Sequence, residues 1–342
     1  MIEYRRSAPE DREPIVRLLT QEMAPAQASA KSAAFDWQYV HNPHSDGRSP
    51  FMLAILNGEI VGVRAAMPAR IIYQGERRMA VWNCDTRVAA RCRGQGIVVE
   101  MKTRMQDEAD VLMAYGSTPI MRRILDRSGW QASRDLAGYS FHVSEPGMKG
   151  ALKNLQTRLY RLGQWPARKT TAEVTVYTDS DFGPDVDELW ARSAPTHFSA
   201  VERDAAYLNW KYRRHPLLRY CWYGARVDGR LSGVLVARAD ADTSVIVDYC
   251  GPLGVDEVMA DLVDAAVQDL SKRGTRRIHC ETTDPGMASA LRKNGFRTSR
   301  GDYSFRLRCN YLDDPDPVRK FFLMTGDSDN DFTALTPTAP NA

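Results

Sequence analysis

The sequence repeats itself over a long interval, and this repeat limits the folds open to the chain more than any other feature. The segments Phe35–Pro43 and Leu208–Pro216 share the pattern W-x-Y-x-x-x-P, and their tryptophans, Trp37 and Trp210, lie 173 residues apart. Further matches follow in the same order: the turns before Gly62 and Gly233, the pairs Gly129-Trp130 and Gly295-Phe296, and the triplets Tyr139–Phe141 and Tyr303–Phe305. The last match has an offset of 164 residues, so the second copy has shorter loops. We therefore expect one fold written twice.

The two copies account for most of the 342 residues. Each covers about 140 residues, an ordinary size for one domain. We place the first domain at residues 1–143 and the second at 172–308, followed by a C-terminal tail at 309–342. Residues 144–171 carry apolar positions at helical spacing with lysines and arginines elsewhere, which predicts a basic amphipathic linker. Such a helix usually packs on a neighbouring domain, and contact with a membrane surface is the alternative.

The spacing of apolar residues predicts the same elements in each copy, in the order strand, helix, helix, three strands, helix, strand, helix, strand. In the first copy we expect strands at 2–6, 51–56, 59–66, 78–88 and 110–115, and helices around 15–19, 97–109 and 119–126. The middle strands are joined by short glycine turns, which indicates antiparallel pairing. The expected fold class is α/β (α+β), with two domains that each contain a mixed, mostly antiparallel sheet flanked by helices.

Charge and composition argue against several classes of protein. With 46 lysines and arginines against 43 aspartates and glutamates, the net charge is +3, too even for a dedicated nucleic-acid surface. No run of ~18 apolar residues is present, so we expect no integral membrane segment and a cytoplasmic location. The six scattered cysteines form no C-x-x-C pair, and the acidic stretch Thr325–Asp331 lacks the distal glutamate of a calcium loop. We therefore expect neither a disulfide framework nor a metal site.

A glycine-rich turn in the first copy, Arg91–Val98, has the chemistry of a diphosphate site. Glycines before a helix leave backbone N–H groups free at the positive end of the helix dipole, and no side chain holds a phosphate away. Arg91 and Arg93 add positive charge. An ordinary strand-to-helix turn with solvated arginines is the alternative interpretation.

In its context this turn resembles the pyrophosphate loop of the GNAT superfamily of acyl-CoA-dependent N-acyltransferases, usually written Q/R-x-x-G-x-G/A. Two registers are open: the pattern starts at Arg93 and ends on Val98, or starts at Arg91 and ends on Gly96. The resemblance covers both copies, which makes the chain similar to tandem GNAT proteins. It implies acetyl-CoA or another short acyl-CoA as co-substrate. The residues implied in its binding are Arg87, Val88, Arg93, Gly94, Gln95, Gly96, Ile97 and Val98.

The second copy differs at the equivalent turn, Cys250–Gly254. This turn is shorter, has no arginine, and contains Pro252, which has no N–H to donate. We predict that the second copy does not bind CoA productively. We expect the second copy either to pair with the first copy structurally or to line an acceptor pocket between the domains.

The resemblance implies direct attack of an amine on the thioester, with the oxyanion held by a backbone N–H near Thr86–Val88. Asp85 lies just ahead of the loop and is the candidate general base, with a surface or salt-bridged aspartate as its structural alternative. Glu22 is a weaker candidate, because the early helical region commonly covers the acceptor pocket in this family. Covalent catalysis through Cys84 or Cys92 is disfavoured, since Cys92 lies within the phosphate turn.

The general acid is where the sequence departs from the family. Many members place a tyrosine four residues before the Gly-aromatic pair, but those positions are Leu125 and Leu291 here. Tyr115 is the candidate general acid in place of that tyrosine, and the alternative interpretation is a tyrosine of the core. The other option is that the CoA thiolate leaves without a general acid. Ser117 and Thr118 fit a helix cap better than a catalytic role.

We expect an N-acyltransferase that moves an acetyl or similar group to a primary amine of a small molecule, such as an amino sugar. The alternatives are an acyl-CoA sensor without turnover, a mycothiol-synthase-like transferase, and a Fem-like transferase, although Fem-like proteins have lost the CoA loop. We expect a monomeric pseudo-dimer or a homodimer. The tryptophan of the repeated motif is present in both copies, as Trp37 and Trp210, although the second copy lacks the CoA loop. A structural role is therefore expected for both residues.

Overall fold

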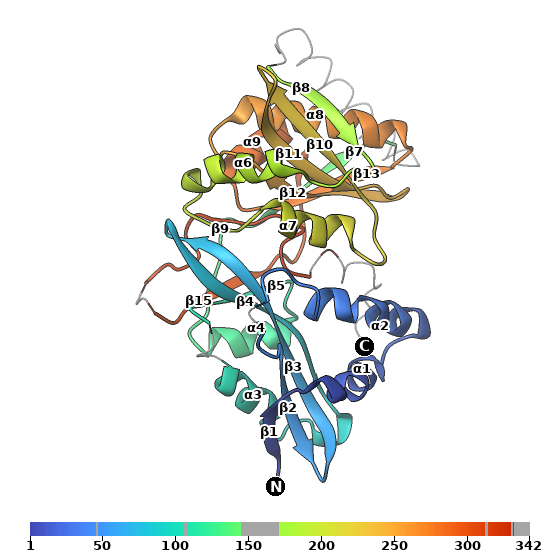
Figure 1. Ribbon diagram of the computed structural model, residues 1–342, viewed down its shortest axis with the longest axis vertical. Coiled ribbons are helices and arrows are strands. Elements are labelled where there is room, and N and C mark those ends of the chain that lie inside the picture. The colour runs from blue at the N-terminus through green and yellow to red at the C-terminus, as the bar shows by residue number, and fades with distance from the viewer. Residues whose placement is uncertain (46, 106–108, 145–170, 312–313, 330, 332–342) are drawn as a thin grey trace.

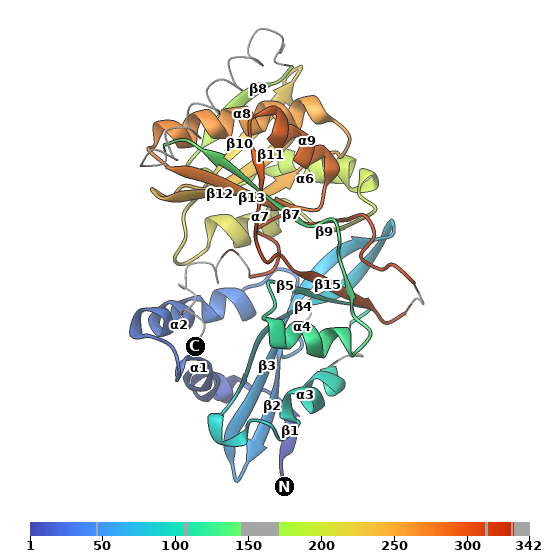
Figure 2. The same ribbon diagram turned by 180° about the vertical axis from the view of Figure 1, so that it is seen from behind.

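The computed structural model describes the chain except for residues 46, 106–108, 145–170, 312–313, 330 and 332–342. Two sheets with their helices lie one above the other along the long axis of the molecule (Figure 1), and the view from behind shows the same arrangement (Figure 2). The linker expected at 144–171 falls almost entirely outside the described residues, as does the end of the expected tail. None of the described helices is long and apolar enough to cross a bilayer.

The first sheet has the strand order β1-β2-β3-β4-β5-β15-β6, with β9 paired to β3 and β16 to β9. Its strands are β1 (Glu3–Arg6), β2 (Phe51–Leu56), β3 (Glu59–Tyr73), β4 (Glu76–Val88), β5 (Val111–Tyr115), β6 (Gln131–Ala132), β9 (Ser199–Val201), β15 (Phe305–Cys309) and β16 (Phe321–Phe322). The turns Asn57-Gly58 and Gln74-Gly75 have positive φ at both residues, as tight hairpin turns require. Because β4 and β5 are parallel and β1 to β4 antiparallel, the sheet is mixed.

The second sheet has the order β14-β7-β13-β12-β11-β10-β8. Its strands are β7 (Ala137–His142), β8 (Glu173–Tyr177), β10 (Tyr220–Val227), β11 (Arg230–Arg238), β12 (Thr243–Cys250), β13 (Arg277–Thr282) and β14 (Arg297–Ser299). Here too one central pair, β12 and β13, is parallel while β10, β11 and β12 are antiparallel. Two mixed, mostly antiparallel sheets confirm the expected fold class.

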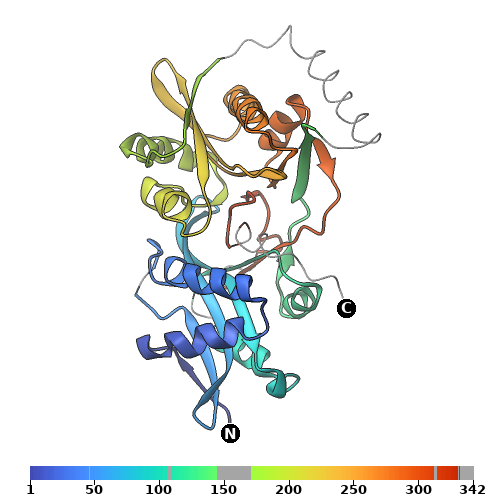
Figure 3. The ribbon, with the colours of Figure 1, turned by 90° about the vertical axis from the view of Figure 1, so that its right-hand side faces the viewer.

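Helices cover both faces of each sheet. The helices are α1 (Arg12–Thr20), α2 (Pro25–Tyr39), α3 (Ile97–Met105) and α4 (Pro119–Asp126) in the first half, and α6 (Pro184–Ser193), α7 (Ala205–Leu208), α8 (Asp256–Lys272) and α9 (Pro285–Lys293) in the second. Figure 3 shows α1 and α2 on one side of the first sheet and α3 and α4 on the other. The element order of the first copy is the order expected from the sequence. For the helix expected at 97–109, the structure describes Ile97–Met105, and residues 106–108 lie outside the described residues.

The two halves exchange their last strands. β7, which ends the first copy, pairs with β13 of the second sheet, and β15, which ends the second copy, pairs with β5 of the first sheet. The ranges 1–143 and 172–308 therefore divide the sequence repeat but do not divide the two sheets. The exchange gives β5 and β13 a hydrogen-bonded neighbour on the side where each would otherwise be an open edge.

The repeated W-x-Y motif lies where the two halves meet. Trp37 donates from Nε1 to the carbonyl of Trp210 at 2.7 Å, and Trp210 donates in return to the carbonyl of Trp37 at 2.8 Å. The two rings stack at 5.0 Å and both are buried. Reciprocal contacts of this kind define a local two-fold axis, so the motif forms the contact between the copies. The structural role expected for these tryptophans agrees with this position.

Candidate functional site

In the first half, β4 and β5 separate at the end that carries the expected site. Their pairing runs from Ala80↔Val111 to Trp82↔Met113 and stops there, although β4 continues to Val88. The register of β4 against β3 shifts by one residue at Cys84-Asp85, which marks a β-bulge. A bulge bends its strand, so it accounts for the divergence. Beyond Trp82 and Met113, the described residues include no strand that fills the space between β4 and β5.

The expected phosphate turn follows β4 directly. Gly94 and Gly96 both have positive φ, 80° and 77°, a conformation that glycine adopts without strain. The N–H groups of Gly94, Gln95 and Gly96 donate no hydrogen bond to any described residue. The first N–H groups of α3, from Ile97 on, also lack partners within the helix. A cavity of about 250 Å³ opens here, lined by Val88, Cys92, Arg93, Gly94, Gly96, Ile97, Val98 and Val99.

Most of the cofactor residues expected from the sequence line this cavity, and Arg87 and Gln95 lie beside it. Arg87 and Arg93 both bind the carboxylate of Glu22, at 2.8 Å and 2.6 Å. Arg93 and then Arg87 lower the pKa of Glu22, which keeps this carboxylate ionised. Glu22, a weaker candidate for the base, therefore lies at the phosphate turn, where an anion would compete with it for both guanidinium groups. Arg91 turns away and pairs with Glu59 at 2.5 Å.

Asp85 stands at the bulge in contact with α2. Its Oδ2 receives a hydrogen bond from Tyr39 at 2.7 Å and an ion pair from Lys31. Burial lowers the pKa of Lys31, but the charges of Asp85 and Asp329 outweigh burial, so the net shift is upward and Lys31 remains an ammonium ion. Burial and then Asp85 raise the pKa of Tyr39 well above its usual value, which keeps it a hydrogen-bond donor. The structure thus makes Asp85 a salt-bridged residue.

The second copy contains the same three-residue arrangement. Asp248 follows the bulge of β12, accepts a hydrogen bond from Tyr212 at 2.7 Å, and binds Arg203 at 2.8 Å. One function of the Asp85 arrangement is therefore to hold the bulge, since the arrangement persists where the phosphate turn is absent. The two aspartates differ in solvent exposure: the side chain of Asp85 is 17% exposed and that of Asp248 is 2% exposed.

Tyr115 lies across the divergence from the bulge. It is two residues past Met113 on β5, as Cys84 is two residues past Trp82 on β4. Its hydroxyl donates to Oε2 of Glu281 on β13 of the second copy. Burial and then the charge of Glu281 raise the pKa of Tyr115 well above its usual value. Glu281 was not among the residues expected at the site, although the repeat offset of 166 residues makes it the counterpart of Tyr115.

The remaining candidates have structural surroundings. Leu125, at the position of the family's tyrosine, is buried in a small apolar cluster with Leu112 and Trp130. Thr118 caps α4 by accepting from the N–H of Met121 at 3.3 Å. Burial raises the pKa of the Cys84 thiol well above its usual value, so it is not poised as a nucleophile.

In the second half, the corresponding divergence of β12 and β13 is filled by the chain itself. We call Phe321–Asp329 the C-terminal arm. The N–H of Gly326 donates to the carbonyl of Val247 at 2.7 Å, and the N–H of Thr283 donates to the carbonyl of Leu323 at 3.1 Å. The N–H of Glu281 adds a bond to Oγ1 of Thr325 at 2.7 Å. The arm falls within the C-terminal tail expected at 309–342, although its apolar run Phe321–Met324 is typical of a strand.

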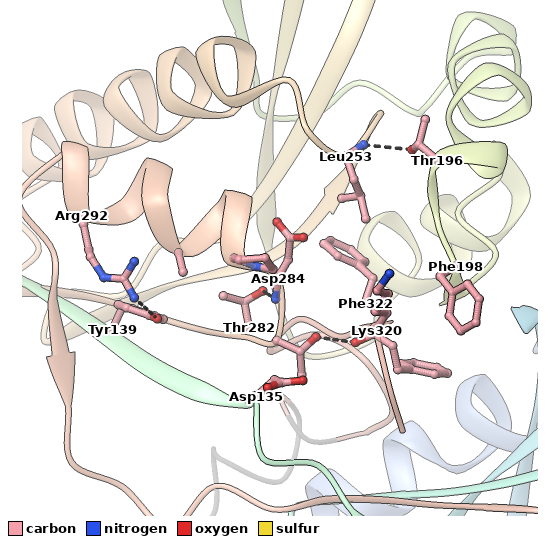
Figure 4. A pocket seen from close by; sticks show the side chains of 14 residues that line it. Asp135, Tyr139, Thr196, Phe198, Leu253, Thr282, Asp284, Arg292, Lys320 and Phe322 are labelled. Atoms are coloured by element: carbon pink, nitrogen blue, oxygen red, sulfur yellow. Dashed lines mark hydrogen bonds between the residues drawn. The ribbon is translucent and has the colours of Figure 1, made fainter. Parts of the chain in front are cut away.

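The turn of the second copy has fewer N–H groups to offer an anion than the turn Arg93–Val98. Pro252 has no N–H, and the N–H of Leu253 already donates to Oγ1 of Thr196 at 2.9 Å. Asp256 and Glu257 stand in the first turn of α8, where their charge repels phosphate. A cavity of about 500 Å³ remains outside the arm, between this turn and α9. Figure 4 shows Leu253 and Thr196 on one side of it and Arg292, bonded to Tyr139, on the other.

Three side chains at the contact between the halves lie close enough to share a cation: His44, Glu202 and Asp204 have ligand atoms within 4.8 Å of one another. His44 Nδ1 accepts the backbone N–H of Arg70 at 3.0 Å, so the proton of the neutral ring sits on Nε2 and leaves no lone pair for a metal. Arg70 pairs with Asp204 at 3.2 Å and Arg77 with Glu202 at 3.1 Å. These contacts describe an ion-paired junction between the halves.

No protein-family model and no curated protein matches the sequence. Solved structures match the fold over 90% of this chain. A GCN5-related N-acetyltransferase from Anabaena variabilis matches with a TM-score of 0.62 and 11% sequence identity, and the match covers 73% of that protein. A GCN5-related N-acetyltransferase from Kribbella flavida matches with a TM-score of 0.61 and 13% sequence identity, and the match covers 71% of that protein. N-myristoyltransferase from Saccharomyces cerevisiae with bound myristoyl-CoA matches with a TM-score of 0.53 and 11% sequence identity, and the match covers 82% of that protein. The chain therefore has the fold of the GCN5-related N-acetyltransferases, present in two copies.

Proposed function

We propose that the chain is an acyl-CoA-dependent N-acyltransferase whose first copy binds the acyl-CoA. The observation that carries this proposal is the difference between the copies. The first copy has a strand divergence without a filling strand and a turn with free N–H groups. The second has a filled divergence and a turn in which Pro252 has no N–H and the N–H of Leu253 is already engaged. Structures that share the fold include acetyltransferases and a myristoyl-CoA complex, which supports the choice of an acyl-CoA.

In this proposal the diphosphate binds the turn Arg93–Val98, where Arg87 and Arg93 exchange Glu22 for phosphate oxygens. The pantetheine lies along the free edge of β4 beyond Trp82, as an added strand would. The thioester then reaches the bulge, where a backbone N–H near Thr86–Val88 receives the developing oxyanion.

Asp85 on β4 and Tyr115 on β5 stand on the two strands that flank that position, and they are the two candidates for proton transfer. Oδ1 of Asp85 has no hydrogen-bond partner among the described residues, so it could accept a proton. The hydroxyl of Tyr115 is committed to Glu281, so its oxygen presents lone pairs to the opposite side. The amine forms the new C–N bond as the C–S bond breaks, and a CoA thiolate is a stable enough leaving group to depart without a separate acid. The proposed acyl group is acetyl or another short chain, and the proposed acceptor is a primary amine of a small molecule, such as an amino sugar.

One observation favours a second function, acyl-CoA binding without turnover. Leu125 is buried in an apolar cluster at the position where many family members carry their acid. A sensor would bind acetyl-CoA with the same turn and release no thiol in the presence of amines.

The first prediction uses two glycines with the same geometry in the two copies. Gly96 and Gly254 have φ of 77° and 82°, and a Cβ at either would touch nothing within 4 Å. Gly96→Val is expected to lower acetyl-CoA affinity at least 10-fold in titration calorimetry, because it strains the turn and places a side chain where the diphosphate binds. Gly254→Val is the matched control, with the same local strain and no expected change in affinity.

A thiol-release assay over a panel of primary amines completes this test. Thiol release with any amine supports the transferase, and binding without release supports the sensor. If wild-type protein fails to bind acetyl-CoA, or if Gly254→Val weakens binding more than Gly96→Val, the proposed assignment of the copies is wrong.

A further inference from the structure

Two residues at equivalent positions of the repeat meet between the halves. Tyr115 ends β5 and Glu281 lies on β13, 166 residues later, and the hydroxyl of Tyr115 donates to Oε2 of Glu281. A carboxylate has no proton to give, so the phenolic proton points to Glu281 and the other side of the phenol oxygen can only accept. Tyr115 lies on β5 beyond Met113, where the pairing with β4 has ended, and its phenol oxygen is a proton acceptor backed by a carboxylate.

The hydrogen-bonded chain continues toward solvent. Nε2 of His279 lies 3.4 Å from Oε1 of Glu281, and Oγ of Ser140 lies 3.2 Å from Nδ1 of His279. The side chain of Glu281 is 13% exposed and that of His279 is 20% exposed, whereas Tyr115 is buried. The order Tyr115, Glu281, His279 thus leads from the interior of the first copy to the surface of the second.

Other residues surround this hydrogen-bonded chain. The N–H of Glu281 is fixed by Thr325 of the C-terminal arm, and the ring of His279 stacks against Tyr303. Asp327 and the thiol of Cys280 lie near Tyr115 from the arm and from β13. The charge of Asp327 is balanced by Arg203 at 2.8 Å, so Glu281 is the acceptor in contact with the phenol.

We propose that Glu281, acting through Tyr115, is the general base of the reaction and that His279 passes its proton to solvent; this inference rests on the proposed N-acyltransferase function. An acceptor that arrives as an ammonium ion gives one proton to the oxygen of Tyr115, while the phenolic proton moves to Oε2 of Glu281. The free amine then attacks the thioester, the C–N bond forms and the C–S bond breaks. The second nitrogen proton goes to the departing sulfur, so the products are the amide, the thiol of CoA and one released proton.

This assignment gives the second copy a part in the chemistry of the first. It also separates two roles that the sequence combined in Asp85. Lys31 and Tyr39 engage Asp85 in an arrangement that the second copy repeats with Arg203 and Tyr212, which fits a residue that holds the bulge. Glu281 has no such counterpart, because Tyr115 stands at the equivalent position.

The test is the pH profile of kcat/KM for the amine, measured on the full chain with saturating acetyl-CoA. Glu281→Gln preserves an acceptor for the Tyr115 hydroxyl but cannot take its proton. We expect a loss of about 100-fold near neutral pH, within the range of general-base catalysis. The loss should shrink as the pH rises, because solution then supplies the free amine. Glu257→Gln, the same change at an exposed position of the second copy, should follow the wild-type profile.

Two further variants test whether Glu281 acts through Tyr115. Tyr115→Phe should give the same loss in the same pH range, and the double variant Tyr115→Phe/Glu281→Gln should be no worse than the poorer single variant. His279→Asn should lower kcat/KM by a smaller factor in the same range, since Glu281 is itself partly exposed.

Acetyl-CoA affinity separates the possible failures. If Glu281→Gln binds acetyl-CoA and keeps the wild-type pH profile, or loses activity equally at every pH, or adds its effect to that of Tyr115→Phe, the relay is wrong while the transferase stands. If Glu281→Gln does not fold, Tyr115→Phe, which removes one oxygen, decides the same question alone. If wild-type protein neither binds acetyl-CoA nor releases thiol, the proposed function itself is wrong.

Discussion

Asp85 and Lys31 form an ion pair at the bulge of β4. Asp85 stands ahead of the turn Arg91–Val98, a position that suits a general base, whereas its partner Lys31 lies 54 positions earlier on α2. Its counterpart Asp248 binds Arg203 in the copy without the turn. A residue whose arrangement survives the loss of the cofactor turn has a structural function, whatever else it does.

The pair itself can be tested by stability. Asp85→Asn removes one of the two carboxylates that stabilise the buried ammonium of Lys31, the other being Asp329. Breaking a buried pair costs about 3 kcal/mol, and we expect a smaller loss of about 2 kcal/mol in chemical denaturation, because Asp85 is partly exposed and Asp329 remains. The double variant Lys31→Met/Asp85→Asn should recover most of it, because the buried ammonium is removed as well. A double variant that is less stable than Asp85→Asn would contradict this account.

At the same scale, the reciprocal tryptophans should be the most sensitive point of the junction. Trp37→Ala removes a buried indole that stacks on Trp210 and leaves the carbonyl of Trp210 without its donor. We expect a loss of about 3–5 kcal/mol in urea denaturation, as for other large core truncations. Val99→Ala, at an exposed apolar position on α3, is the control and should change stability by less than about 0.5 kcal/mol. Equal effects of the two changes would mean that the tryptophan pair does not join the halves.

At the scale of elements, local features were predictable and long-range pairings were not. The repeat, the element order and the turn Arg93–Val98 depend on neighbouring residues, and the structure contains all three. The exchange of β7 and β15 was not predictable, because the same Tyr-Ser-Phe triplet lies within β7 and leads into β15 at Phe305, so the sequence does not distinguish the two sheet edges. The arm was missed because its hydrogen-bond partners, Val247 and Thr283, lie about 80 and 40 residues before it.

The arm provides a prediction at this scale. A Cβ at Gly326 would lie 2.4 Å from the hydroxyl of Tyr212 and 2.9 Å from the carbonyl of Val247, so any side chain pushes the arm away from β12. We expect Gly326→Ala to cost about 1–3 kcal/mol, the usual range for overpacking a filled site, and to lower the melting temperature. Gly183→Ala, whose Cβ would meet only an ordinary contact at 3.4 Å, should change stability by less than about 1 kcal/mol.

Acetyl-CoA stoichiometry completes the Gly326 test. Loosening the arm should not create a second binding site, because Pro252 and the acidic start of α8 remain. Calorimetry should therefore give one site per chain before and after the change. Two sites in Gly326→Ala would show that the arm alone closes the second copy.

At the scale of the whole molecule, the exchanged strands make the halves interdependent. A chain cut within residues 145–170 yields two pieces that each contain the last strand of the other's sheet. We expect the pieces to be unstable when expressed separately and to form a stable 1:1 complex when expressed together, as judged by size exclusion and circular dichroism. A first piece that folds cooperatively by itself would show that β15 is dispensable to the first sheet.

The strand exchange also sets the order in which the molecule can be completed during synthesis. The first sheet receives β15 from residues 305–309, so β5 remains an open edge until almost 200 further residues have been synthesised. Chains usually fold from the N-terminus as domains emerge, and an unpaired strand edge is prone to aggregation. The sheet that precedes the turn Arg93–Val98 is therefore completed only after the second copy has been made, and a ribosome that stops before residue 305 leaves this sheet unfinished.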